Sequence, residues 1–263
     1  MIRVQNLVKN FGEIQAVRGI SFEVQRGEIF AFLGPNGAGK TTTIKMLTTL
    51  LRPTSGVIEL DGLDPTVHQH QVRSRFGIVF QDPSLDSELT AYENMELHAT
   101  LYKVPRGMRA ARIEKLLTLF ELWERRNDLV KQFSGGMRRR LEIARGLLHT
   151  PKILFLDEPT LGLDPQTRNQ LWSHIQKLNE AEGVTVFLTT HYMEEAERVA
   201  HRIAIIDHGR IIAQGSPAEL KQQTEAETLE QAFLKLTGFS IREESASSLD
   251  QMRAFAQMWQ RRR

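Results

Sequence analysis

A stretch of eight residues near the N-terminus has the residue types of a phosphate cradle. It matches the pattern G-x-x-x-x-G-K-[ST] and consists of Gly34, Pro35, Asn36, Gly37, Ala38, Gly39, Lys40 and Thr41. Its glycines let consecutive backbone N–H groups turn toward one anion, and a following helix would direct its positive end at the same anion. In this pattern the Lys40 ammonium reaches the β- and γ-phosphates, while the Thr41 hydroxyl binds Mg²⁺. We therefore predict that these residues and the adjacent Thr42 bind ATP with Mg²⁺.

Two adjacent carboxylates follow an apolar run and could supply the remaining chemistry. The run Ile153–Leu156 is typical of a buried strand, and Asp157 and Glu158 come directly after it, ahead of Pro159. A strand end beside the cradle is where a second Mg²⁺ ligand has to lie, so Asp157 is the predicted ligand. Glu158 is then the candidate that orients and deprotonates the attacking water. The alternative is that both acids only end a strand and open a turn; the cradle upstream favours the chemical interpretation.

A second anion-binding turn occurs between two helical stretches, at Ser134, Gly135 and Gly136. A hydroxyl, two unhindered amides and a helix N-terminus together form a site for a negative charge. One ATP has no need of two cradles, whereas a second copy of the chain could present this turn from the opposite side. The pattern therefore favours a head-to-tail dimer with two-fold symmetry and two ATP molecules at its interface.

Short β-rich runs and turns position the cradle. The expected strands are Ile2–Val8, Ile14–Val17, Ile20–Val24, Glu28–Leu33, Val57–Leu60 and Gly77–Phe80, with turns at Gly12, Gly19, Gly27 and Asp61-Gly62. The continuous apolar run Glu28–Leu33 is typical of a strand buried on both faces. Because it comes directly before the cradle, and a helix is expected over Thr42–Leu51, the cradle has the strand–loop–helix context that its mechanism requires.

The middle of the chain has a different character. Residues 85–150 contain almost no β pattern, and Ile113, Leu116, Leu117 and Phe120 recur at helical spacing, which predicts a helical insertion. Beyond it, strands are expected at Ile153–Leu156, Val184–Leu188, Ile203–Ile206 and Arg210–Ala213, and a helix at Pro165–Glu182. The predicted fold class is α/β: a P-loop NTPase core with a mostly parallel sheet, an N-terminal antiparallel β subdomain and a helical subdomain insertion.

The domain boundaries follow from these patterns. We expect an ATPase domain over residues 1–220, made of a β subdomain and P-loop core (1–84), the helical subdomain (85–150) and the rest of the core (151–220). Residues 221–263 are expected to form a helical C-terminal extension. Near its end Leu249, Met252, Phe255 and Trp259 share one helical stripe. This stripe could dock on a partner or a membrane surface, or it could pack on its own domain.

Composition excludes several classes of function. Of the 263 residues, 41% are hydrophobic and 25% are charged, as in ordinary globular proteins. The absence of cysteine excludes disulfide frameworks and thiolate metal sites. The formal net charge of +2 is too small to indicate a nucleic-acid partner. No run approaches the ~18–20 apolar residues of a membrane span, so any membrane crossing would be the task of another chain.

Over residues 1–220 the chain resembles the ATP-binding subunits of ABC transporters. Gly34–Thr41 resembles the Walker A motif, Ile153–Glu158 the Walker B motif, and Phe133–Met137 the signature motif. The signature is usually Leu-Ser-Gly-Gly-Gln, so Phe133 and Met137 depart from it while the Ser-Gly-Gly core is intact. The resemblance implies that Ser134, Gly135, Gly136 and Met137 face the ATP of a partner subunit.

The same resemblance implies roles for isolated residues. Gln81 is similar to the Q-loop glutamine, which senses the γ-phosphate and Mg²⁺. Leu161–Asp164 resembles the D-loop at the dimer interface, and His191 the switch histidine that hydrogen-bonds the γ-phosphate. Phe11 occupies the position of an aromatic residue stacked on adenine, which needs only a π-face, and Val17 is expected beside the base. For Phe11 the alternative is an ordinary core position.

Finer features are similar to the daunorubicin-resistance type of ATP-binding subunit. They include Pro159-Thr-Leu-Gly-Leu-Asp-Pro and Thr228-Leu-Glu-Gln-Ala-Phe-Leu. This resemblance implies a subunit at the cytoplasmic face of the cell membrane that powers separate transmembrane permease subunits and exports a drug, lipid or glycan. A homodimer is expected, because two complete motif sets would make both ATP sites competent. Pairing with a sister chain stays open. The alternative function is a soluble ABC-type ATPase acting on nucleic acid or ribosomes; no second cassette or zinc insertion favours it, so no nucleic-acid partner is expected.

Overall fold

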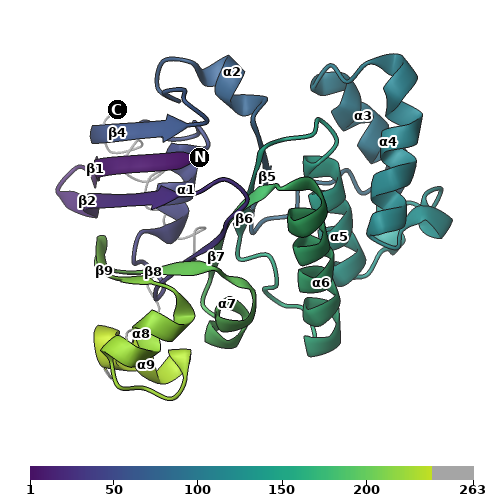
Figure 1. The fold of residues 1–263 in the computed structure, drawn as a ribbon. Helices are drawn as coiled ribbons and strands as arrows, with labels where there is room; N and C mark the ends of the chain where they lie inside the picture. Colours follow the sequence, from purple (N-terminus) through teal and green to yellow (C-terminus); the bar gives the residue numbers. More distant parts are fainter. Residues whose placement is uncertain (239–263) are drawn as a thin grey trace, which may run out of the picture.

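The computed structural model describes residues 1–238, so the stripe expected at residues 249–259 lies outside the described residues. Nine strands form two sheets (Figure 1). The strands are β1 (Ile2–Phe11), β2 (Ile14–Val24), β3 (Ile29–Leu33), β4 (Ser55–Leu60), β5 (Phe76–Val79), β6 (Ile153–Asp157), β7 (Thr185–Thr190), β8 (Arg202–Asp207) and β9 (Arg210–Gly215). The smaller sheet has the order β2-β1-β4 and is antiparallel. The larger has the order β5-β6-β7-β3-β8-β9 and is parallel except for β9.

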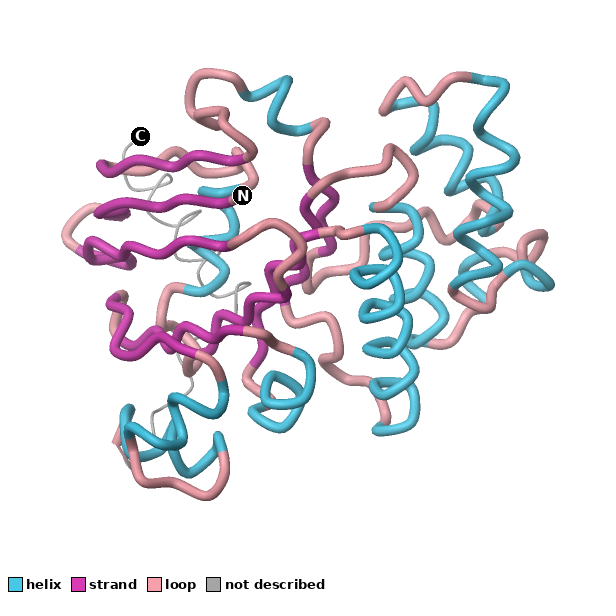
Figure 2. The backbone as a smooth tube through the Cα atoms, in the orientation of Figure 1, coloured by secondary structure: helices cyan, strands magenta, loops and turns pink. Residues whose placement is uncertain are grey.

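Helices lie on both faces of the larger sheet, and on one face they also separate it from the smaller sheet (Figures 1 and 2). They are α1 (Lys40–Leu47), α2 (Gln69–Arg73), α3 (Ala91–Leu101), α4 (Arg106–Leu119), α5 (Gly135–Gly146), α6 (Pro165–Glu182), α7 (Met193–Val199), α8 (Pro217–Gln223) and α9 (Leu229–Thr237), with short 3₁₀ turns at Trp123–Arg125 and Val130–Gln132. The predicted fold class is confirmed: an α/β core, an antiparallel N-terminal sheet and a helical insertion. None of the described helices has the length and apolar character needed to cross a membrane.

Strand β3 divides the core between two clusters, as expected for a strand buried on both faces. Phe30 and Phe32 pack with α1 and the small sheet, and each of their rings meets those of Phe22 and Phe187 at a centroid distance of 5.6 Å. The alternate residue Leu33 belongs to the cluster beneath the helical insertion. Because both faces of β3 are packed, its carboxyl end is a rigid base for the loop that follows.

Two sequence predictions were wrong in detail. Gly19 is not a turn: β2 is one continuous strand, and Gly19, with φ +77°, is the extra residue of a β-bulge opposite Leu7 and Val8. The helix predicted to end at Leu51 ends at Leu47. Thr49 takes a left-handed backbone (φ +65°), and the N–H groups of the two residues after it both return to the Lys45 carbonyl.

Candidate active site

The strand order brings three separate motifs together. Strands β6, β7 and β3 are neighbours and parallel, so their carboxyl ends lie at one edge of the sheet. The Gly34–Thr41 loop follows β3, Asp157 ends β6 with Glu158 directly after it, and His191 follows β7. An edge of this kind is the usual ligand-binding position of a parallel α/β sheet.

The cradle loop is packed so closely that its first and last glycines admit no side chain. A Cβ atom on Gly34 would overlap the Ile206 carbonyl oxygen, and one on Gly39 would lie 2.7 Å from the Ala16 carbonyl oxygen. Gly39 also has φ +109°, which side chains disfavour. Helix α1 begins at Lys40 without a side-chain cap. Its first N–H groups and its positive end are therefore free to receive an anion such as a phosphate.

Lys40 is folded back into its own loop. Its ammonium donates to the carbonyls of Gly34 at 2.7 Å and Pro35 at 3.2 Å, and it lies 3.5 Å from the Glu158 carboxylate. Burial lowers its pKa, and the charges of Glu158 and Asp157 oppose that effect. A buried ammonium with carboxylate neighbours stays charged, which suits it to bind a phosphate oxygen.

Oxygen ligands for a metal converge at Thr41 and Asp157. The Thr41 hydroxyl donates to Asp157 Oδ1 at 3.4 Å, and the Thr189 hydroxyl donates to the same oxygen at 2.6 Å. Burial raises the pKa of Asp157, although both hydroxyls act against it. Within the described chain no three metal-ligating His, Cys, Asp or Glu side chains gather. A hydroxyl beside one buried carboxylate fits Mg²⁺, which takes few protein ligands and completes its shell with phosphate and water.

Glu158 is held at a fixed position by three neighbouring residues. Its backbone N–H donates to the Thr189 hydroxyl and carbonyl, both at 3.1 Å, and its backbone takes the left-handed region with φ +48°. Its carboxylate accepts from His191 Nδ1 at 2.8 Å on one side and meets Lys40 on the other. Burial alone would raise the pKa of Glu158, but the hydrogen bond from His191 and the charge of Lys40 bring it below its usual value. The carboxylate is therefore ionised at neutral pH.

The two residues expected near adenine differ in exposure. Phe11 is 41% exposed, with the Lys9 ammonium 5.1 Å from its ring centroid, so its ring is open for stacking. Val17 is wholly buried, and a Cβ on Gly39 would lie 3.4 Å from its Cγ2. Val17 therefore packs against the cradle loop, and its place beside the base stays a prediction.

The Ser134 turn is a helix N-terminus of the expected kind. Ser134 caps α5, its hydroxyl accepting the Met137 N–H at 3.3 Å, and both Ser134 and Gly135 are exposed. None of the described hydrogen bonds or ion pairs joins this turn to Lys40 or Glu158 of the same chain. Asp164 caps helix α6: its carboxylate accepts the Thr167 N–H at 3.0 Å and the Thr167 hydroxyl at 2.6 Å.

Gln81 lies in the loop after β5 with its side chain exposed. None of the described hydrogen bonds connects it to Thr41 or Asp157, so its part in binding the metal beside those two residues stays a prediction. Sequence reasoning missed Thr189, which contacts both Asp157 and Glu158. Its only signal was a polar residue ending an apolar strand, and its role depends on β7 lying beside β6.

Comparison with known proteins agrees with this geometry. The model of the family described as "ABC transporter" matches residues 17–161. The daunorubicin resistance ATP-binding protein DrrA3 of Streptomyces coeruleorubidus is 41% identical over 252 residues, which cover 91% of this chain and 79% of that protein. These matches favour a transporter subunit over the soluble alternative.

Two solved structures have the same fold. An ATP-binding subunit of an ABC transporter superposes with a TM-score of 0.82 at 30% identity, covering 90% of this chain and 100% of its own. The ATP-binding cassette MJ0796, a dimer in a post-hydrolysis state bound to ADP and phosphate, gives a TM-score of 0.74 at 30% identity, covering 82% of this chain and 98% of its own. The chain therefore belongs to the ABC transporter family and is an ATP-binding subunit of that family.

Proposed function

We propose that this chain hydrolyses ATP at the edge formed by β3, β6 and β7 and uses the reaction to drive a membrane exporter. The observation that carries the proposal is the position of Glu158, ionised and held between Lys40 and His191 beside Asp157. A carboxylate fixed next to a phosphate cradle is the arrangement that in-line attack of water on a γ-phosphate requires.

Each residue has a defined part in the reaction. Lys40 and the backbone N–H groups of the cradle loop, to which Pro35 contributes none, bind and orient the phosphates, and Phe11 stacks on adenine. Glu158 accepts a proton from water as the water oxygen bonds to the γ-phosphorus and the bond to the β–γ bridging oxygen breaks. His191 orients Glu158 and the γ-phosphate. Mg²⁺, held by Thr41 and Asp157 with Gln81 reaching the same position, would offset the negative charge of the phosphates.

A second copy of the chain would complete each site. Ser134 and Gly135 of this turn are exposed, and none of the described hydrogen bonds or ion pairs joins the turn to the cradle of its own chain. Two protomers arranged head to tail would place each turn against the partner's ATP, with Asp164 near the interface. The dimeric state of MJ0796 with ADP and phosphate supports this arrangement for the homodimer that we propose.

A membrane subunit is the proposed recipient of the work. The described helices include none suited to span a bilayer, and the similarity to a daunorubicin resistance protein supports coupling to a permease at the cytoplasmic face of the membrane. We propose a drug, lipid or glycan as cargo. ATP would close the dimer, closure would move the permease, and hydrolysis would reopen the dimer.

The test is purification from membranes with the chain as bait. We expect a hydrophobic membrane protein to co-purify and to stimulate hydrolysis of ATP. Recovery with ribosomes or DNA, or hydrolysis by a strictly monomeric chain with no dependence on protein concentration, would contradict the proposal.

A further inference from the structure

The loop that carries Gln81 is fastened to helix α5 through its backbone. Arg139 donates from Nη1 to the Phe80 carbonyl at 2.6 Å and from Nη2 to the Gln81 carbonyl at 3.2 Å. These contacts leave the Gln81 side chain exposed while its backbone position is set. One planar guanidinium thus donates to two successive carbonyls, each through a different nitrogen atom.

Two more side chains of α5 hold the other end of the same loop. Glu142 Oε1 accepts the Ser84 N–H at 2.7 Å, and Arg145 donates to the Ser84 carbonyl at 2.8 Å and to its hydroxyl. Residues 81–84 lie outside the described helices and strands, and the hydrogen bonds described for their backbone all come from α5. The path of this loop is therefore determined by one helix.

Arg139 and Glu142 are buried and paired with each other. The side chains of Arg139 and Glu142 are 9% and 4% exposed and pair at 3.1 Å. Burial lowers the pKa of Arg139, and the charges of Glu142 and Asp157 oppose that effect. A buried ion pair is expensive to desolvate, and an apolar pair of similar volume is often as stable. The ion pair makes hydrogen bonds that an apolar pair could not make. Arg139 donates to two carbonyls of the loop, and Glu142 accepts the Ser84 N–H.

Helix α5 begins at the Ser134 turn, so the loop and the turn are attached to one rigid element. Arg139 lies five residues after Ser134, which is roughly 7.5 Å along a helix axis. We propose that Arg139 and Glu142 are positioning residues that make the Gln81 loop and the Ser134 turn move as one body, and thereby couple the two ATP sites of a dimer. The inference rests on the proposed function, in which Gln81 serves its own ATP and Ser134 serves the partner's.

The first test measures how firmly Arg139 and Glu142 hold the Gln81 loop, and it does not require hydrolysis of ATP. In the full-length double variant R139M/E142L, amide hydrogen exchange in residues 80–85 should accelerate at least about tenfold, because the Ser84 N–H loses its acceptor. R140M is the matched control: Arg140 is the next residue on the helix, and it binds the Phe120 carbonyl and Glu121 instead of the loop. Exchange in R139M/E142L equal to that of wild type and R140M would overturn the proposal.

The second test measures coupling. Wild-type hydrolysis should depend on ATP concentration with a Hill coefficient near 2, whereas R139M/E142L should fall toward about 1 with ATP affinity within about threefold of wild type. A noncooperative wild type would argue against the proposed dimer with two ATP sites. A variant as cooperative as a cooperative wild type would refute only the role of Arg139 and Glu142 in coupling those sites. Should the double variant fail to fold, R139M decides: methionine donates no hydrogen bond to either carbonyl while Glu142 can still accept the Ser84 N–H, so full cooperativity in R139M contradicts the inference.

Discussion

The Lys40 ammonium lies 3.5 Å from the Glu158 carboxylate, and both side chains are less than a tenth exposed. The same carboxylate accepts a hydrogen bond from His191 at 2.8 Å. A phosphate oxygen that binds Lys40 would compete with Glu158 for the ammonium. Phosphate binding would thus leave one Glu158 oxygen available to a water molecule. Nucleotide binding would in this way free Glu158 to act as the base.

Replacing Glu158 by glutamine should separate binding from hydrolysis. The amide has the same shape and can still accept a hydrogen bond from His191 or Lys40, but it cannot take up the proton of water. We expect E158Q to bind ATP with near wild-type affinity and to hydrolyse it about 10²–10⁴-fold more slowly. Equilibrium binding of ATP and single-turnover release of phosphate measure the two effects. Turnover at the wild-type rate would exclude Glu158 as the base.

His191 should control the pH dependence of turnover through Glu158. Its hydrogen bond is one of the contacts that lower the pKa of Glu158 against the effect of burial. In H191A that contact is lost, so the Glu158 pKa rises and the carboxylate becomes protonated at a higher pH. The acid limb of the profile of kcat against pH should therefore move to higher pH, in addition to any fall in the maximum rate. An unchanged acid limb with a lower plateau would assign His191 to the phosphate alone.

Local signals in the sequence were sufficient for some elements. Helix α6 was predicted and observed at Pro165–Glu182 because both of its ends are encoded locally. Asp164 caps its first turn, proline occupies the first helical position, and Gly183 ends it with a left-handed backbone at φ +65°. The cradle was equally local, since glycines and a lysine at fixed spacing define it.

Features that depend on distant neighbours could not be predicted in this way. The bulge at Gly19 follows from the register of β2 against β1, and the contact between Thr189 and Asp157 follows from the strand order. Arg139 and Glu142 belong to a basic helical stretch that gave no sign of holding a loop more than 55 residues earlier in the chain. Only the packing of α5 beside that loop gives these two side chains a role.

The glycine at position 136 should be required for steric reasons as well as for phosphate binding. A Cβ there would overlap the Thr167 Cγ2 methyl, whereas one on Gly135 would lie 3.9 Å from Leu163 Cδ2, an ordinary contact. We expect G136A to lower the free energy of unfolding by about 1–3 kcal/mol and G135A to be much milder. Urea titrations of both variants measure the difference.

A second substitution, T167S, tests whether overlap with the Thr167 methyl is the cause of the instability expected for G136A. Serine removes the overlapping methyl but keeps the hydroxyl that donates to Asp164. The double variant G136A/T167S should therefore recover most of the lost stability, relative to T167S alone. If it stays as unstable as G136A, the overlap with Thr167 is not the cause.

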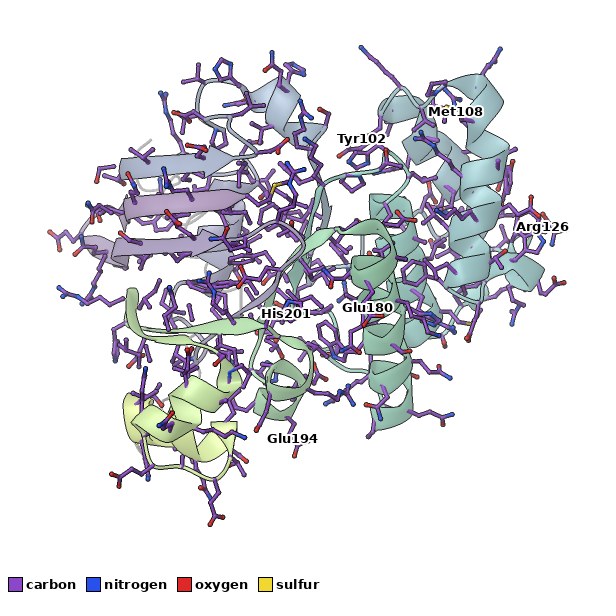
Figure 3. All side chains as sticks on the ribbon, in the orientation of Figure 1. Tyr102, Met108, Arg126, Glu180, Glu194 and His201 are labelled. Carbon is purple, nitrogen blue, oxygen red and sulfur yellow. The ribbon has the colours of Figure 1, made fainter. Side chains whose placement is uncertain are left out.

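Three stacked rings join the helical insertion to the core. Tyr102, at the end of α3, stacks on His98 at a centroid distance of 4.5 Å and on His149 at 4.0 Å, and the two histidine rings lie 6.3 Å from each other; Figure 3 places the Tyr102 ring between the insertion and the sheet. His149 Nε2 also contacts the Phe76 carbonyl at 2.9 Å. Burial, with the positive charge of Arg145 second, lowers the pKa of His98 from 6.5 to about 3.

The lowered pKa of His98 predicts that the protein loses stability in mild acid. Below pH 6.5 His98 takes up a proton in the unfolded chain but stays neutral in the folded protein until about pH 3, so the free energy of unfolding decreases as the pH falls between these values. From pH 7 to pH 5 the decrease should be about 2 kcal/mol. The variant H98F keeps a ring on Tyr102 and cannot titrate, so its urea titrations should lack that part of the decrease. A smaller decrease should remain, because burial also lowers the pKa of His149. An equal decrease in H98F and wild type would show that protonation of His98 does not determine the acid sensitivity.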